Sequence, residues 1–199
     1  RDVSLPLAPV AADDAATVAE DAVLIDTVAG NDSDPNGDAL SFALLTGAAH
    51  GTLAFNADGS YSYTPAADFH GTDSFTYRAS DGTLTDDATV TITVTPVTDR
   101  PVANDDTASA AHNTPVSILL SALLANDSDV DGDTLTIAGV TNGTGGTAQL
   151  VGDHVLFTPN AGFSGAAKFS YTLSDGALSD TAEVTVNVAR TPEEAERQA

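Results

Sequence analysis

The sequence predicts an all-β chain of two tandem sandwich domains, each with about seven short strands. Three observations support this fold class. Apolar and polar residues alternate with a period of two in many short segments. Turn sequences rich in glycine and aspartate separate these segments at short intervals. The whole pattern occurs twice along the 199 residues, so two domains of roughly 90 residues each account for the length.

The clearest alternation lies near the end of each half. Residues 88–94 read ATVTITV, and residues 184–188 read VTVNV, so one face of each segment is apolar. Earlier in the first half, the apolar residues of 53–55 and 61–63 flank Asp58-Gly59, a dipeptide that favours a tight hairpin turn. Apart from the acidic tail at 190–199, no segment has helical spacing.

The two halves are copies of one repeat. Phe75 aligns with Phe169, and Tyr77 aligns with Tyr171, at one constant offset that also superposes the Ser-Asp-Gly turns. The repeat predicts a first domain at 8–98, a second domain at 101–189 and a tail at 190–199. The connection between the domains begins and ends with proline, which makes it short and stiff.

The charge of the chain excludes several functions. The formal net charge is −23, with only 6 Lys and Arg residues, whereas phosphate binding needs clustered basic side chains. We therefore expect no nucleic-acid partner, and no insertion into a membrane because no apolar run is long enough. Cysteine is absent, so disulfides and cysteine-ligated zinc are excluded. A bound metal ion is then the expected stabiliser of small domains.

Two aspartate-rich loops are the main candidates for metal binding. Both match the first half of the calcium-loop pattern D-x-[DN]-x-[DN]-G, which places oxygen ligands at alternate positions. The candidate ligands are Asp32, Asp34, Asn36 and Asp38 in the first loop, and Asp127, Asp129, Asp131 and Asp133 in the second. The closing Glu of an EF-hand is missing: its positions are Ala43 and Ala138, within strand patterns. The sequence therefore predicts Ca²⁺ held in another type of site.

Further oxygen ligands must come from outside these loops. Acidic residues that recur in both halves, or that lie in the connection, are the candidates: Asp14, Asp81, Asp99, Asp105, Asp106 and Asp175. The alternative is that the aspartates only cap turns and stay hydrated. We favour the metal, because carboxylates packed this closely repel one another without a cation. Calcium is favoured over magnesium because many flexible oxygens are available.

A family resemblance rests on these motifs as a group. The strings VTPVTDRPVANDD, ANDSDVDGD and FNADGSYSYTPAADFHGTDSFTY and the SDG turns resemble the cadherin-like, VCBS-type repeats of bacterial RTX adhesins. The chain also resembles the Rap-type calcium-dependent lectins. The resemblance implies Ig-like or cadherin-like sandwiches that bind calcium, are secreted or displayed on the bacterial surface, and adjoin other domains of a larger adhesin. It also implies an ion at the junction, tied to Asp99.

Two positions depart from the repeat. Ala167 stands where the first half has Asp73, and His112-Asn113 stands where it has Glu20-Asp21. The second half is therefore expected to bind its ion differently.

Catalysis is not expected. The histidines occupy no position shared by both halves, no G-x-S-x-G motif occurs, and Glu20 and Glu183 do not align. The sequence thus predicts a non-enzymatic, monomeric, calcium-rigidified adhesion module that supports cell or matrix attachment. The alternative is a calcium-dependent lectin that binds exopolysaccharide or a cell-surface glycan. An exopolysaccharide titration with and without chelator separates the two.

Overall fold

The computed structural model describes residues 5–191, which fold as two units. Unit 1 extends to Val97, and unit 2 begins at Thr98. Each described unit is a sandwich of two β-sheets with seven strands, which confirms the predicted fold class. Of the predicted tail, only Arg190 and Thr191 lie within the described residues.

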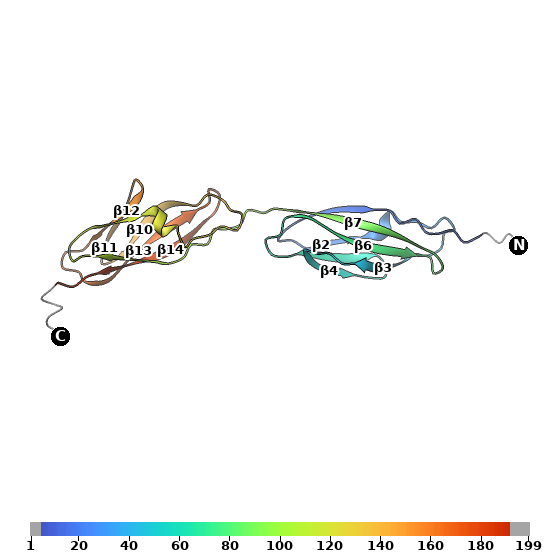
Figure 1. Ribbon diagram of the computed structural model, residues 1–199, viewed down its shortest axis with the longest axis horizontal. Helices are drawn as coiled ribbons and strands as arrows, with labels where there is room; N and C mark the ends of the chain where they lie inside the picture. The colour runs from blue at the N-terminus through green and yellow to red at the C-terminus, as the bar shows by residue number, and fades with distance from the viewer. Residues whose placement is uncertain (1–4, 192–199) are drawn as a thin grey trace. The chain divides into compact units, whose positions relative to one another are not determined.

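Unit 1 pairs a four-stranded sheet with a three-stranded one (Figure 1). In chain order, the strands of its described part are β1 (Asp14–Ala19), β2 (Leu24–Thr27), β3 (Ser41–Thr46), β4 (Gly51–Phe55), β5 (Ser60–Pro65), β6 (Gly71–Ser80) and β7 (Thr85–Thr95). The sheet orders are β1-β7-β6-β3 and β2-β5-β4. All neighbours are antiparallel except β1 and β7, which run parallel from Asp14 beside Val90 to Ala19 beside Thr95.

Unit 2 repeats this topology. Its described strands are β8 (Asp106–Ala110), β9 (Val116–Leu119), β10 (Thr136–Thr144), β11 (Gly146–Val151), β12 (His154–Pro159), β13 (Gly165–Ser174) and β14 (Ser179–Val188). The sheets are β10-β13-β14-β8 and β11-β12-β9, again with the first strand parallel to the last. Strand β10 is bulged at two places along its pairing with β13. The internal repeat of the sequence is therefore a repeat of structure.

The period-two alternation forms the core of each unit. In unit 1, Tyr63, Phe75 and Tyr77 are at most 1% exposed, between the two sheets. Phe157, Phe169 and Tyr171 take the corresponding positions in unit 2. Burying each such side chain contributes about 1.5–3 kcal/mol relative to exposing it. In β7 and β14, polar side chains alternate with buried alanine, valine and isoleucine, as the sequence predicts.

Two short helical turns were not expected from the sequence. A 3-10 helix, η1 (Val28–Gly30), precedes the first aspartate-rich loop, and α1 (Leu120–Leu123) precedes the second. Val28 and Leu123 are buried. Elements of three and four residues are too short to produce a helical period, so the spacing of apolar residues in the sequence did not reveal them. No helix among residues 5–191 is long and apolar enough to cross a membrane.

Candidate metal centre

The two aspartate-rich loops fold into the same turn. Loop 1 is residues 32–38 and loop 2 is residues 127–133. In loop 1, Asp34 Oδ1 accepts hydrogen bonds from the backbone N of Asn36 at 2.7 Å and of Asp38 at 3.1 Å. In loop 2, Asp129 Oδ1 accepts the equivalent bond from Asp133 N at 3.2 Å. Gly37 and Gly132 have φ of +81° and +76°, a conformation that glycine adopts without strain.

The second carboxylate oxygen of each central aspartate has no donor. Asp34 Oδ2 and Asp129 Oδ2 are shielded from solvent and accept no hydrogen bond from the described residues. Shielded carboxylate oxygens normally have partners, because an unmet one costs about 1–3 kcal/mol. A cation at each loop would supply the missing partner. These two oxygens are at equivalent positions of the repeat, so both units have the same unsatisfied carboxylate oxygen.

Loop 2 gathers three of the predicted ligands. Oxygens of Asp129, Asp131 and Asp133 all lie within 4.8 Å of one another. Three carboxylates this close repel strongly unless a cation or protons compensate them. Loop 1 has Asn36 in place of the middle carboxylate, so it carries one charge fewer.

Loop 1 borders an acidic cavity. A surface cavity of about 450 Å³ is lined by Asp34 and Asp38, together with Asp32, Asp58 and the ring of Phe42. Asp58 was not among the predicted ligands, because it lies in the β4–β5 hairpin, far from loop 1 in sequence. Hydrogen bonds from Ser60 hold the pKa of Asp58 below its usual value, so this carboxylate is charged at neutral pH.

Four predicted ligands, Asp14, Asp32, Asp106 and Asp127, contact the hydroxyls of two buried tyrosines. In unit 1, Tyr77 Oη donates to Asp32 Oδ2 at 2.9 Å and lies 3.3 Å from Asp14 Oδ2. Burial and repulsion from Asp32 raise the pKa of Asp14, against the hydrogen bond from Tyr77.

Unit 2 repeats this arrangement. Tyr171 Oη lies 2.9 Å from Asp127 Oδ2 and 3.2 Å from Asp106 Oδ2. Burial, with repulsion from Asp127, also raises the pKa of Asp106. The aligned tyrosines were the signal in the sequence that could have located both clusters.

Three other predicted ligands have backbone partners. Asp81 and Asp175 each accept two backbone N–H bonds at 2.6 Å from the turn that follows them. Asp105 accepts one bond at 2.8 Å from Glu183 N. The contacts of Asp81 and Asp175 are those of turn-capping aspartates, whereas Asp105 joins the start of unit 2 to strand β14. Asp175 Oδ2 is also shielded from solvent without a donor. None of the three lies in the loop 2 cluster.

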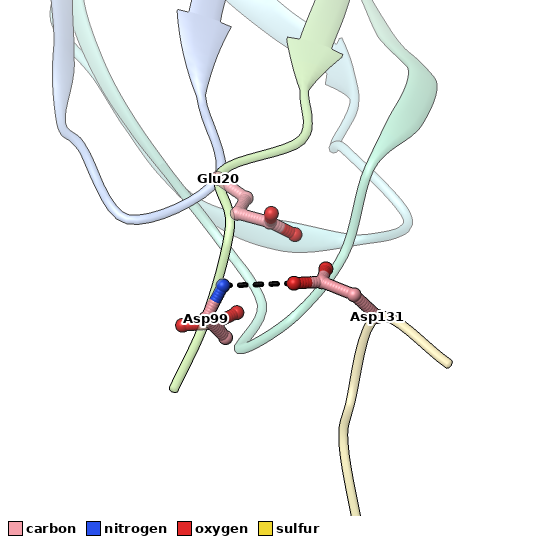
Figure 2. A group of neighbouring side chains, drawn as sticks. All are labelled: Glu20, Asp99 and Asp131. Atoms are coloured by element: carbon pink, nitrogen blue, oxygen red, sulfur yellow. Dashed lines mark hydrogen bonds between the residues drawn. The ribbon is translucent and has the colours of Figure 1, made fainter. Parts of the chain in front are cut away.

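Asp99 belongs to unit 2 and contacts loop 2. Its backbone N donates to Asp131 Oδ2 at 2.8 Å (Figure 2). The segment that leads into unit 2 is therefore held by a carboxylate of the metal-binding candidate. Any ion that fixes the side chain of Asp131 also fixes this segment.

Unit 1 contains a buried carboxylate at Asp73, the position where unit 2 has Ala167. Asp73 is 4% exposed. It accepts hydrogen bonds from Ala49 N at 3.0 Å, His50 N and Tyr63 Oη at 2.8 Å, and Ser74 N at 2.8 Å. Its side chain thus joins the loop before β4 to strands β5 and β6.

Comparison with known proteins agrees with this architecture. Residues 7–96 match the bacterial cadherin-like domain family, and residues 98–187 match the bacterial Ig domain family. No curated protein sequence matches the chain.

Among solved structures, human protocadherin-24 EC1-2 superposes with a TM-score of 0.53 at 15% identity, covering 94% of this chain and 100% of that one. Drosophila N-cadherin EC1-4 gives 0.52 at 16% identity, covering 90% and 50%. An endo-fucoidan hydrolase of glycoside hydrolase family 107, MfFcnA4, gives 0.39 at 26% identity over 92% of this chain; the chain spans only 29% of that enzyme. These likenesses concern the fold.

The repeated sandwich and the family matches together assign each half of the sequence to a domain family. The chain consists of a bacterial cadherin-like domain at residues 7–96, followed by a bacterial Ig domain at residues 98–187.

Proposed function

We propose that the chain is a non-enzymatic, calcium-binding adhesion module of a secreted or surface-displayed bacterial protein. Cadherin-like and Ig-like domains are adhesion-type modules, and they are generally not enzymes. The observation that carries the calcium proposal is the pair of shielded, unpartnered oxygens, Asp34 Oδ2 and Asp129 Oδ2. Calcium takes about six to eight oxygen ligands in flexible geometry, which suits the carboxylates of these loops.

Calcium binding would also stiffen loop 2 and the segment that it contacts. An ion bound by Asp129, Asp131 and Asp133 neutralises their mutual repulsion and restricts their side chains. Asp131 accepts the backbone bond from Asp99 (Figure 2), so ordering loop 2 also orders the start of unit 2 at Asp99.

Calorimetric calcium titration tests the metal sites. We expect the unchanged chain to bind calcium, and Asp129→Asn with Asp133→Asn to abolish binding in unit 2 but not in unit 1. Asp34→Asn with Asp38→Asn should do the reverse, because sites without shared partners act independently. Asp68→Asn is the control: it removes one exposed charge at a positive φ that asparagine tolerates. Unchanged stoichiometry in both double variants would refute the loop assignment.

A second function, calcium-dependent binding of exopolysaccharide or a cell-surface glycan, is favoured by one observation. The cavity beside loop 1 is far larger than an ion needs, and carboxylates of Asp32, Asp34, Asp38 and Asp58 line it. Sugar hydroxyls pair with carboxylates and can complete the coordination of a bound calcium ion.

Titration with a bacterial exopolysaccharide, in calcium and in chelator, tests this second function. Binding should require calcium and should be lost in Asp58→Ala. The control is Asp153→Ala, which removes an exposed carboxylate from the corresponding hairpin of unit 2. Equal binding with and without chelator would eliminate the calcium-dependent lectin.

A further inference from the structure

The chain contains two Asn-Gly pairs in very different surroundings. Asn36-Gly37 lies in loop 1, and Asn142-Gly143 lies in strand β10. In an Asn-Gly pair the glycine has no Cβ to obstruct its own backbone nitrogen. That nitrogen can therefore reach the side-chain carbonyl carbon, Cγ, of the asparagine more easily than in any other Asn-X pair.

We propose that Asn36 is a site of spontaneous deamidation that converts loop 1 into the all-aspartate form of loop 2. The backbone nitrogen of Gly37 attacks Asn36 Cγ and loses its proton. The Cγ–Nδ2 bond breaks, and Nδ2 leaves as ammonia with that proton, which leaves a five-membered succinimide. Water then opens the ring at one of its two carbonyl carbons. Opening at Cγ gives aspartate, and opening at the backbone carbon gives isoaspartate.

The surroundings of Asn36 leave room for this reaction. Asn36 and Gly37 are both exposed, and the space where a Cβ of Gly37 would stand has no neighbour within 4 Å. Asn36 Oδ1 accepts one hydrogen bond, from Leu7 N at 2.8 Å, while Nδ2 donates to no atom of residues 5–191. The leaving amide is thus free to depart, and the one acceptor bond polarises the carbonyl that is attacked.

One contact opposes the reaction. Gly37 N donates to Asp34 O at 3.1 Å across the turn, so the nucleophile is released only when this bond opens. A single exposed turn bond outside the sheets opens at small free-energy cost. The fold therefore adds little to the activation barrier of ring closure, and the reaction proceeds when the Gly37–Asp34 hydrogen bond opens briefly.

Asn142-Gly143 provides a contrast within the same chain. Asn142 is paired with Phe169 in the β10–β13 ladder, and its Oδ1 is held by Ala148 N at 2.6 Å. Gly143 sits so close to β13 that an added Cβ would lie 2.5 Å from Lys168 O. Gly143 lies at a bulge of β10, between Asn142 and Thr144, which are paired with Phe169 and Lys168. These pairings and the bond from Ala148 N restrain both the asparagine side chain and the backbone around Gly143, so the fold protects this pair.

The product has a specific consequence. Loop 1 reads D-S-D-P-N-G-D, and loop 2 reads D-S-D-V-D-G-D. Asn36 is the one acid position of loop 2 that loop 1 fills with an amide, at the place of Asp131. Deamidation to aspartate adds a carboxylate at that place, whereas the isoaspartate product lengthens the loop backbone by one methylene group.

The test is to incubate the folded chain at neutral pH and 37 °C in chelator, followed by peptide mapping with mass spectrometry over time. Chelator keeps the outcome independent of the proposed calcium site. We expect aspartate and isoaspartate to accumulate at Asn36 while Asn142 stays intact, with Asn36→Asp as the authentic standard for one product. In denaturant, both Asn-Gly pairs should convert at comparable rates.

Two controls sharpen the result. In denaturant, where the chain is unfolded and the variant cannot act by changing the fold, Gly37→Ala should slow deamidation at Asn36 because a Cβ obstructs the attacking nitrogen. Asn36→Gln should give no acid at this position on the same timescale, since ring closure from glutamine is slower. An intact Asn36 after Asn142 has begun to react in the folded chain, or equal rates at both pairs, would overturn the proposal.

Discussion

Replacement of Asp73 by Ala is expected to lower the free energy of unfolding of unit 1 by about 4 kcal/mol and to leave unit 2 unchanged. The variant removes the acceptor of four hydrogen bonds, from three backbone N–H groups and the hydroxyl of Tyr63. Donors left without a partner in a buried place cost about 1–3 kcal/mol each, reduced where water enters. Chemical denaturation followed by tyrosine fluorescence measures the loss.

The second unit provides the matched control. At the positions of Tyr63 and Asp73 it has Phe157 and Ala167, which are fully buried. The double variant Tyr63→Phe, Asp73→Ala reproduces this apolar pair in unit 1. We expect it to be about as stable as Asp73→Ala alone, because in that variant the Tyr63 hydroxyl keeps only its longer bond to His50 O at 3.3 Å, whereas Tyr63→Phe in the unchanged chain should cost about 1 kcal/mol. Equal costs of Tyr63→Phe in both backgrounds would show that the two side chains are not coupled.

The same contacts set a pH dependence. Burial alone would raise the pKa of Asp73, but the hydrogen bonds from Ala49, His50, Tyr63 and Ser74 outweigh it and hold the pKa below its usual value. The unfolded chain therefore binds a proton at higher pH than the folded one, so this stabilisation is present above about pH 4 and is lost as the pH falls through the folded-state pKa. The titratable groups beside it are Tyr63, whose hydroxyl donates to it at 2.8 Å, and His50, with Nδ1 3.7 Å from Asp73 Oδ1. Asp73→Ala should remove this part of the acid dependence of unit 1.

Calcium is expected to give the second large effect, on thermal stability. At about 100 times its dissociation constant, an ion that binds only the folded state adds about 2.7 kcal/mol per site. For a unit of this size, that corresponds to an increase in Tm of about 10–20 °C. Scanning calorimetry in calcium and in chelator measures the shift, at one ionic strength so that screening is constant.

The loop variants assign the shift to a unit. Asp129→Asn with Asp133→Asn should abolish the calcium-dependent shift of unit 2 and preserve that of unit 1, while Asp68→Asn should preserve both. Melting curves that coincide in calcium and chelator for the unchanged chain would contradict calcium binding by the folded state.

The strands were predictable because their signal is local. The alternation of apolar and polar residues at 88–94 and at 184–188 can be recognised from neighbouring residues alone, and these segments lie in β7 and β14. The parallel pairing of β1 with β7 was not predictable in this way, since it joins Asp14 to Val90 across most of unit 1. The helical turns η1 and α1 were missed because neither spans enough residues to show a period.

The turns of the two candidate loops were predictable for the same reason. Loop 1 and loop 2 are contiguous in sequence, and their turns have the expected geometry. The sequence did not reveal Asp58, and it named Asp73 only as an aspartate that the second half lacks. The role of each depends on what the fold brings to it: a cavity beside Asp58, and backbone donors from a distant loop around Asp73. Asp81 and Asp175 show the limit of composition, since an aspartate at a turn has the same sequence signature whether it accepts backbone bonds or holds an ion.

The parallel pairing of the first and last strands determines how each unit responds to mechanical tension. In unit 1, the chain enters β1 at Asp14 and leaves β7 at Thr95, at opposite ends of one parallel ladder. Forces applied at these two points act along the strands in opposite directions, so the ladder is loaded in shear. All its hydrogen bonds then resist together, whereas an antiparallel terminal pair pulled from one end opens bond by bond like a zipper. Strands β8 and β14 give unit 2 the same shear geometry.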